Sequence, residues 1–259
     1  KSNFQIMILS HYTNLQNLPL IVKEDGLNFL LTDYNDFDDP LEGRPMWRIL
    51  EKAYDNKWHE DVWDTFVLSL CNDHDSLPMW KEYTSNATGI ALGIETDKLE
   101  HGTLYDCVYD DISKSAIERE MLQQLHDIRE KYDDAYLRGQ ESYKSGVKAD
   151  NSELSKRIKE KNAVKAAVKS VIRFKDEHYA YERESRFVCS GHGSMERIWS
   201  IKGKKLIHKL HLIEPIDCLS RIYVGPNCGR DGIRCVNEYL ERIGLSSKVP
   251  VIASTLLQF

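Results

Sequence analysis

A long stretch without proline divides this chain into three parts, and it constrains the fold more than any other feature. Residues 112–178 are rich in Glu, Lys, Gln, Leu and Ala, and their only glycines are Gly139 and Gly146. This composition favours helices, and we predict two of them, over about 112–146 and 152–178. The parts on either side contain short apolar runs separated by turn residues, which is typical of strands.

The two flanking parts predict a mixed α and β core. Apolar and β-branched runs indicate strands at 4–9, 63–70, 89–95, 105–109, 181–189, 221–224 and 250–254. Ser76 followed by Pro78 predicts a helix start. A second helix over 231–243 lies between two strands, an order that favours a right-handed crossover. We therefore expect an α+β fold, with 1–259 as a single domain and 112–178 as a helical insertion or lid.

Composition excludes several classes of protein. The 259 residues carry 35 Lys and Arg against 41 Asp and Glu, a net charge of −6. An acidic total argues against a general polyanion-binding protein, and no apolar run approaches the ~18 residues of a membrane span. Six cysteines lie far apart without a CxxC pair, which argues against a disulfide scaffold or a structural zinc site. We expect a globular, cytoplasmic protein with reduced thiols.

The strongest local signal is the sequence YERESRF at 181–187. If it forms a strand, Glu182, Glu184 and Arg186 point to one face, because side chains alternate along a strand. Two carboxylates and a guanidinium are costly to bury without a partner or a function. Such a cluster can stabilise a developing positive charge or bind a sugar hydroxyl. The alternative is an exposed strand face whose charges neutralise each other.

Three other blocks carry polar and aromatic side chains. The segment 11–13, HYT, follows the first apolar run, where His and Thr can bond a ligand while the Tyr ring stacks on it. The segment 79–85, MWKEYTS, places Trp80 and Tyr83 on one helix face, as core packing or as the wall of a pocket. A weaker block, 39–42, is typical of a turn that enters a helix. A satisfied structural histidine remains the alternative for His11.

The second predicted helix carries a row of basic side chains. Residues 151–178 contain eight Lys and Arg against four Asp and Glu. The spacing of four residues puts these basic side chains in one row: Arg157, Lys161, Lys165, Lys169 and Arg173. Either this row is a solvated helix face, or it is a track for phosphates.

The sequence gives no motif for a bound metal or an activated nucleophile. The nearest approaches to metal-ligand spacing are Asp73 with His74 and Asp75, His178 with Glu182, and His208 with His211. None of them matches a known pattern. No elbow motif positions a serine or cysteine. We therefore expect no metal cofactor.

The order of the blocks resembles a large bacterial family defined as a domain of unknown function. The matching motifs are HYT, DP-x-E, MWxxY before a glycine-containing strand, Y-E-x-E-x-R and I-x-V-G-P. In this chain they lie at 11–13, 39–42, 79–83 with 89–93, 181–186 and 222–226. The resemblance spans almost the whole chain but does not itself supply a function.

A second, looser resemblance is to ADP-ribosyltransferases, and it implies a largely antiparallel β core. An early His on a strand, a middle aromatic or Ser/Thr block and a late Glu-x-Glu follow that family's motif order. The resemblance implies that Glu184 is the catalytic glutamate, which stabilises an oxocarbenium-like sugar as nicotinamide departs, and that Glu182 is a base or orients the acceptor. The middle block would be Tyr83, Thr84 or Ser85. This sequence departs from the family in lacking a clean Ser-Thr-Ser strand and in its helical insertion.

The resemblance also implies the residues that hold NAD as a substrate. His11 and Thr13 would bind NAD, and Tyr12 or Tyr83 would stack on nicotinamide beside Trp80. Arg186 or Lys175 would pair with phosphate or a carboxylate. We expect an NAD-dependent transferase, a bacterial toxin or phage-defence effector that modifies a macromolecule.

The expected partners are a nucleic-acid acceptor on the basic helix 152–178 and an antitoxin or inhibitor protein, but no membrane. Two alternatives stay open. One is a metal-independent ribonuclease that uses His11, Glu184 and Arg186. The other is a non-catalytic binding or regulatory module.

Overall fold

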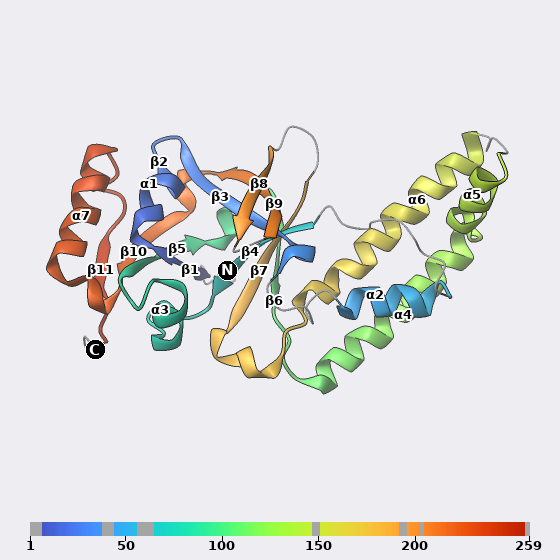
Figure 1. Ribbon diagram of the computed structural model, residues 1–259, viewed down its shortest axis with the longest axis horizontal. Helices are drawn as coiled ribbons and strands as arrows, with labels where there is room; N and C mark the ends of the chain where they lie inside the picture. Colours follow the sequence, from blue (N-terminus) through green and yellow to red (C-terminus); the bar gives the residue numbers. More distant parts are fainter. Residues whose placement is uncertain are drawn as a thin grey trace, which may run out of the picture. The chain divides into compact units, whose positions relative to one another are not determined.

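The computed structural model describes residues 7–37, 44–55, 65–146, 151–191, 196–202 and 205–256 (Figure 1). The chain divides into two compact units. The first unit comprises 1–36, 65–106 and 178–259, and the second comprises 37–64 and 107–177. The second unit therefore takes in a segment before the predicted helical stretch as well as most of that stretch.

The first unit is built on one 11-stranded sheet. Its strands are β1 (Ile8–Asn14), β2 (Val22–Lys23), β3 (Gly26–Asp33), β4 (Thr65–Cys71), β5 (Gly89–Glu95), β6 (Thr103–Asp106), β7 (Glu184–Ser190), β8 (Arg197–Lys202), β9 (Lys205–Glu214), β10 (Leu219–Val224) and β11 (Val251–Ala253). Its α-helices are α1 (Leu18–Ile21), α3 (Leu77–Tyr83) and α7 (Gly229–Arg242).

The sheet has the strand order β11-β10-β5-β1-β4-β3-β9-β8, with β7 pairing to β4 and β6. Its strand pairs are antiparallel except β10 with β11, which are parallel and are connected through α7. Strand β4 pairs with β7 along one side, and along its other side with β1 at Cys71 and with β3 at Phe66 and Val67. The expected mixed α and β architecture, with a largely antiparallel open sheet and several helices, is confirmed.

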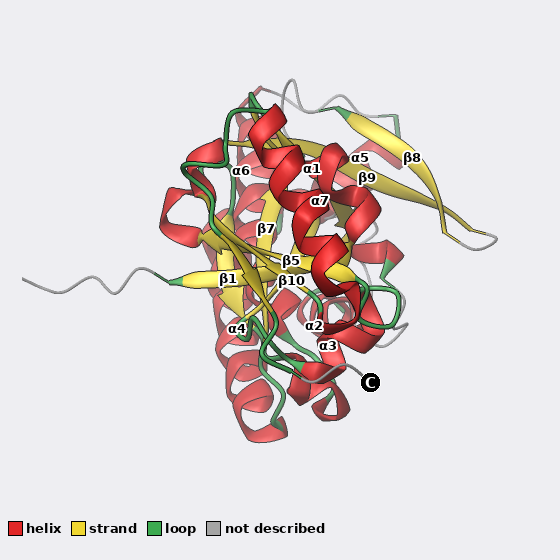
Figure 2. Ribbon diagram, turned by 90° about the vertical axis from the view of Figure 1, so that its left-hand side faces the viewer, coloured by secondary structure: helices red, strands yellow, loops and turns green. Residues whose placement is uncertain are grey.

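The two faces of this sheet bury different side chains. Alternate residues of the central strands, such as Leu9, Leu68 and Leu92, form the main core together with Val236 and Leu240 of α7, which lies in front of β5 and β10 in Figure 2. The other face carries a smaller cluster against α3. Its members are Tyr12, Cys71, Met79, Trp80, Ala87, Ala91 and Tyr223.

The second unit is helical in its described residues. It contains α2 (Arg44–Ala53), α4 (Asp111–Tyr132), α5 (Ala135–Lys144) and α6 (Asn151–Val168). The sequence predicted one helix over 112–146, but Asp133 and Asp134 take positive φ values of 56° and 47°, which ends α4 and separates it from α5. The second predicted helix also stops early, because five residues of 3-10 helix follow Val168.

The two ends of the longer segment of this unit are bonded to each other. Val108 and Phe174 form an isolated bridge, and the Lys175 N–H donates to the Val108 carbonyl at 3.1 Å. Among the described helices, none combines the length and the apolar character that a bilayer span requires.

Several predicted elements match the structure and others do not. The strand at 89–95 coincides with β5, and the helix that follows Ser76 is α3. The first predicted strand ended too early, since β1 runs over Ile8–Asn14 and the segment 11–13 lies inside it. Residues 4–6 of that prediction lie outside the described residues. Strands β3, β8 and β9 were not predicted. The block at 39–42 lies outside the described residues.

Candidate functional site

One face of the sheet collects most of the residues that the sequence singled out. Ser10 of β1 is opposite Cys71 of β4, and Cys71 is opposite Glu184 of β7. Paired residues share a face and side chains repeat every second residue, so Tyr12 and Arg186 lie on this face too. We call it the Tyr12 face. The chain brings together segments more than 170 residues apart to form it.

Glu184 and Arg186 form a buried ion pair on the Tyr12 face. The Arg186 Nε donates to Glu184 Oε1 at 3.2 Å, and Nη2 donates to Oε2 at 3.3 Å. The side chains are only 1% exposed for Arg186 and 4% for Glu184. Two parallel N–H···O bonds fit the planar fork of a guanidinium, and this pairing offsets the cost of burying both charges. The result is a carboxylate held in one orientation.

A pair of reciprocal hydrogen bonds joins α3 to the short 3-10 helix that precedes β7. The Tyr83 hydroxyl donates to Glu182 Oε1 at 2.9 Å, and the Tyr181 hydroxyl donates to Glu82 Oε2 at 2.8 Å. Burial, followed by the negative charge of Glu182, raises the pKa of Tyr83 well above its usual value. The Tyr83 hydroxyl therefore stays protonated and remains a donor at neutral pH.

Glu182 reaches this position because it does not lie on the strand. The sequence predicted a strand over 181–189, but 177–182 is 3-10 helix and β7 begins at Glu184. Arg183 between them has φ of 43°, which breaks the alternation expected of a strand. Its carbonyl accepts the Asn72 N–H at 3.0 Å, so the loop after β4 holds this turn.

The loop 72–76 fixes the aromatic side chains of the Tyr12 face. The Tyr12 hydroxyl donates to the Asp73 carbonyl at 2.8 Å and accepts the Ser76 N–H at 3.1 Å. The Tyr12 and Trp80 rings meet edge to face with centroids 4.8 Å apart. Trp80 is fully buried, so it supports α3 and Tyr12 from behind and presents no surface to a ligand.

The Asp75 side chain connects this loop to α3 and to residues 254 and 255 through hydrogen bonds. Its carboxylate accepts the Trp80 Nε1–H at 2.8 Å and the Ser254 hydroxyl at 2.5 Å, and it also accepts the N–H and hydroxyl of Thr255. Burial alone would raise the pKa of Asp75, but these hydrogen bonds outweigh it and lower the pKa. From the sequence, Asp75 was a candidate only for metal-ligand spacing. Its position directly before Ser76, at the start of α3, was the signal for a structural role.

His11 and Thr13 lie on the opposite face from Tyr12. His11 packs edge to face against Phe29 with ring centroids 5.7 Å apart, and burial lowers its pKa. Thr13 Oγ1 accepts the Asn17 side-chain N–H at 2.8 Å. The structure therefore brings Tyr12, Trp80, Tyr83 and the charged residues of 182–186 together, and it separates His11 and Thr13 from them.

The remaining members of the middle block have local partners. The Thr84 hydroxyl donates to the Trp80 carbonyl at 2.5 Å, and the Ser85 hydroxyl donates to Asn14 at 2.6 Å. Cys71, which sequence reasoning did not single out, lies opposite Glu184. Burial raises the pKa of its thiol to about 11, so the thiol is protonated at neutral pH and is not an activated nucleophile.

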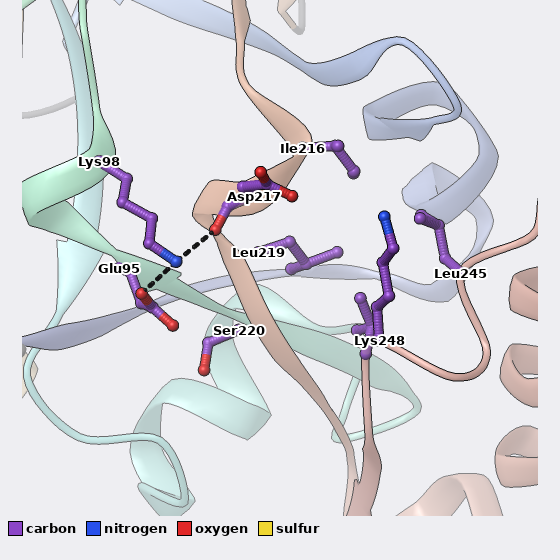
Figure 3. Close-up of a pocket in the computed structure, with 9 residues that line it drawn as sticks. Glu95, Lys98, Ile216, Asp217, Leu219, Ser220, Leu245 and Lys248 are labelled. Carbon is purple, nitrogen blue, oxygen red and sulfur yellow. Dashed lines mark hydrogen bonds and ion pairs between the residues drawn. The ribbon is translucent and has the colours of Figure 1, made fainter.

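A cavity of about 190 Å³ lies elsewhere in the first unit, at the ends of β5 and β10 (Figure 3). Lys98 lines one side of the cavity. Its Nζ forms an ion pair with Glu95 Oε2 at 2.6 Å and donates to the Asp217 carbonyl at 3.1 Å. Lys248 and Leu245 come from the loop after α7. None of the predicted site residues lines this cavity.

The basic row of α6 flanks the buried stripe of that helix. Val164 and Val168 are buried, whereas Arg157, Lys161 and Lys165 are half-buried. Arg157 lies over the Tyr136 ring at 5.5 Å. The described residues contain no group of three or more His, Cys, Asp or Glu placed to hold a metal ion.

Part of this chain is similar to a known family. Residues 79–187 match a family described as "Protein of unknown function (DUF2971)". The matched stretch begins in α3 and ends in β7, so it contains Tyr83, Glu182, Glu184 and Arg186. The resemblance to a domain of unknown function is thereby confirmed. Neither the curated proteins nor the solved structures gave a match, and the resemblance to ADP-ribosyltransferases is not confirmed.

Proposed function

We propose that this protein transfers ADP-ribose from NAD to a macromolecular acceptor, with Glu184 as the catalytic carboxylate. The observation that carries the proposal is the buried two-point pairing of Glu184 with Arg186 on the Tyr12 face. The pairing fixes a negative charge in space before any substrate arrives. A preorganised charge of this kind is most effective toward charge that develops only in the transition state.

The reaction has one demanding step. The bond between the ribose C1′ and the nicotinamide nitrogen breaks, nicotinamide leaves as a neutral molecule with the bonding electron pair, and the ribose becomes cationic. In our proposal Glu184 stabilises this cation and accepts a hydrogen bond from a ribose hydroxyl. An oxygen or nitrogen nucleophile of the acceptor then forms the new bond to C1′ and loses its proton.

The other residues near Glu184 have distinct roles in this proposal. Arg186 is a positioning residue, since it acts on substrate through Glu184. Glu182, bonded to the protonated hydroxyl of Tyr83, orients or deprotonates the acceptor. Tyr83 is 41% exposed, so among these aromatic side chains it is the one suited to contact nicotinamide. The assignment of His11 and Thr13 to NAD binding stays a prediction.

The test is nicotinamide release from NAD, measured for the wild type beside Glu184→Gln. Removing one preorganised group of this kind lowers turnover by roughly 10²–10³-fold, and we expect a loss of that size. Glu214→Gln is the matched control, because Glu214 is another buried carboxylate, located in β9. It should keep wild-type activity, and thermal unfolding of both variants measures any loss of folding.

The outcomes separate the proposal from its alternatives. Equal turnover by Glu184→Gln and wild type contradicts the assignment of Glu184. RNA cleavage without NAD, lost in Glu184→Gln, identifies a ribonuclease instead. Neither activity, with RNA and protein acceptors both supplied, favours a binding or regulatory module.

A further inference from the structure

The hairpin of β8 and β9 extends beyond the strand that supports it (Figure 2). Strand β9 pairs with β3 only from Glu214 to Lys209, whereas β8 and β9 pair as far as Lys202 and Lys205. The last residue pair between β3 and β9 is Thr32 with Lys209. Next to it, the His208 N–H donates to the Asp36 carboxylate at 2.7 Å. The outer part is thus a two-stranded ribbon, and such ribbons are marginally stable in water without a further partner.

The outer part of this hairpin exposes large apolar side chains. Trp199 is 63% exposed, Ile201 is 76% exposed and Leu206 is 60% exposed. The register sets Ile201 opposite Leu206 and Trp199 opposite His208, so all four lie on one face. Large exposed apolar side chains gathered in one place indicate an interaction surface.

The outer edge of β8 faces no other described strand. Among the described strands, only β9 pairs with β8. The His211 N–H donates to the Glu196 carbonyl at 2.8 Å, and antiparallel pairs alternate between bonded and non-bonded. Consequently Trp199 and Ile201 direct their main-chain N–H and C=O groups away from β9.

This edge lacks the features that usually prevent pairing. Proteins protect edge strands with central charges, prolines or bulges. The centre of β8, 198–201, has the sequence IWSI, and its register with β9 is uninterrupted.

The charge of the hairpin differs from that of the chain. The net charge of the whole chain is −6, yet residues 197–211 contain five Lys and Arg and no Asp or Glu. A basic segment of this kind attracts an acidic partner.

We propose that the outer edge of β8 binds an extended, acidic segment of another protein by strand addition. Main-chain hydrogen bonds at Trp199 and Ile201 would supply affinity, and alternate apolar side chains of the partner would pack beside Trp199 and Ile201. A single-stranded RNA fits less well, because the aliphatic side chains and the row of N–H groups would stay unused. One face of the Trp199 ring also meets His208, with centroids 3.6 Å apart. This proposal is independent of the proposed ADP-ribosyl transfer.

The probe is a labelled peptide of about ten residues in which Glu and Val alternate, long enough to pair with a strand of ordinary length. Its binding to the full chain is followed by fluorescence anisotropy. We expect binding that weakens at least about tenfold when alternate residues of the peptide are N-methylated, because methylation removes main-chain donors. A peptide with Lys in place of Glu should bind at least about tenfold more weakly, because charge attraction is lost.

Two variants at one position test the edge from the protein side. Ile201→Pro removes an outward N–H and leaves the ladder to β9 intact, so it should abolish binding. Ile201→Val keeps both the N–H and a branched apolar side chain, and should bind within about threefold of wild type. Circular dichroism reports whether each variant folds. If Ile201→Pro does not fold, the N-methylated peptide tests the same hydrogen bonds on the wild type.

Three results with the probe would overturn the proposal: no binding of the acidic peptide, equal binding of its N-methylated form, or tighter binding of a single-stranded RNA of similar length. A fourth would be a homodimer, detected by sedimentation, that Ile201→Pro dissociates and the acidic peptide does not.

Discussion

Arg183 has a backbone conformation that non-glycine residues rarely adopt. Its φ of 43° lies in the left-handed region, where a Cβ costs about 1 kcal/mol or more. Arg183 separates Glu182 from Glu184. Its left-handed conformation therefore forms the turn that sets the position of each carboxylate. A sequence of alternating charges predicts a regular strand there, and nothing in the residue types indicates the turn.

The strain at Arg183 gives a matched pair of substitutions. Arg183→Gly should raise the free energy of unfolding by about 0.5–1 kcal/mol, because glycine adopts this φ without a steric penalty. Its exposed contact with Asp73, at 3.9 Å, contributes little. Arg183→Val should lower the free energy of unfolding, since a branched side chain fits this region worst. Urea unfolding measures both, and equal stability of the two variants would show that the turn is not strained.

Asp75 gives a prediction of pH dependence. Its pKa is lowered in the folded protein from the ordinary value of 3.8. Its stabilising contribution is therefore complete above pH 3.8 and is lost as the pH falls through the lower pKa of the folded state. Asp75→Asn should lower the free energy of unfolding by about 1–2 kcal/mol at neutral pH, and its stability should depend less on pH below 3.8. An unchanged acid dependence in this variant would contradict the role of Asp75.

At the scale of elements, two Tyr-to-Glu hydrogen bonds hold α3 to the segment before β7. The two accepting carboxylates differ in how far they are buried. Glu182 is 3% exposed, whereas Glu82 is on the surface. Tyr83→Phe removes a donor from a buried carboxylate and should lower the free energy of unfolding by about 1–3 kcal/mol. Tyr181→Phe should change it by less than about 0.5 kcal/mol. Denaturant unfolding compares the two, and a larger loss for Tyr181→Phe would be inconsistent with this account.

Local patterns predicted some elements well because those elements depend on local sequence. The strand at β5 is bounded by glycine and acidic residues, and α3 begins with Ser76 and Pro78, so their limits could be predicted. The identity of the buried charged strand at 184–186 was also predictable, because Glu and Arg two residues apart share a face.

Other elements depend on tertiary pairing that the sequence does not reveal. Strands β3 and β9 were missed, although they pair with each other from Leu27–Glu214 to Thr32–Lys209, nearly 180 residues apart. The side of the sheet on which His11 lies was missed as well, because it follows from the register of β1 with β4 and of β4 with β7. Ser10 is opposite Cys71, and Cys71 is opposite Glu184. Tyr12, and not His11, therefore shares the face of Glu184.

At the scale of the whole molecule, each unit has its own buried side chains. Leu125 of α4 and Leu92 of β5 are both fully buried, the first in the helical unit and the second in the sheet. Leucine-to-alanine changes at such sites cost about 2–5 kcal/mol. We expect Leu125→Ala to raise hydrogen exchange in α4, α5 and α6, and Leu92→Ala to raise it in the sheet. Equal loss of protection throughout the chain in both variants would show one cooperative unit.

The bridge between Val108 and Phe174 has a consequence for how the sheet assembles. Strands β6 and β7 pair with each other, yet some 80 residues separate them in the chain. Closing a loop of that length is entropically unfavourable, although the cost grows only with the logarithm of its length. Once the helical segment has folded, its two ends are already together, and β6 and β7 meet as if a short connection joined them. Lengthening or shortening that segment should therefore alter the folding rate of the sheet very little, provided that the contact at its base is kept.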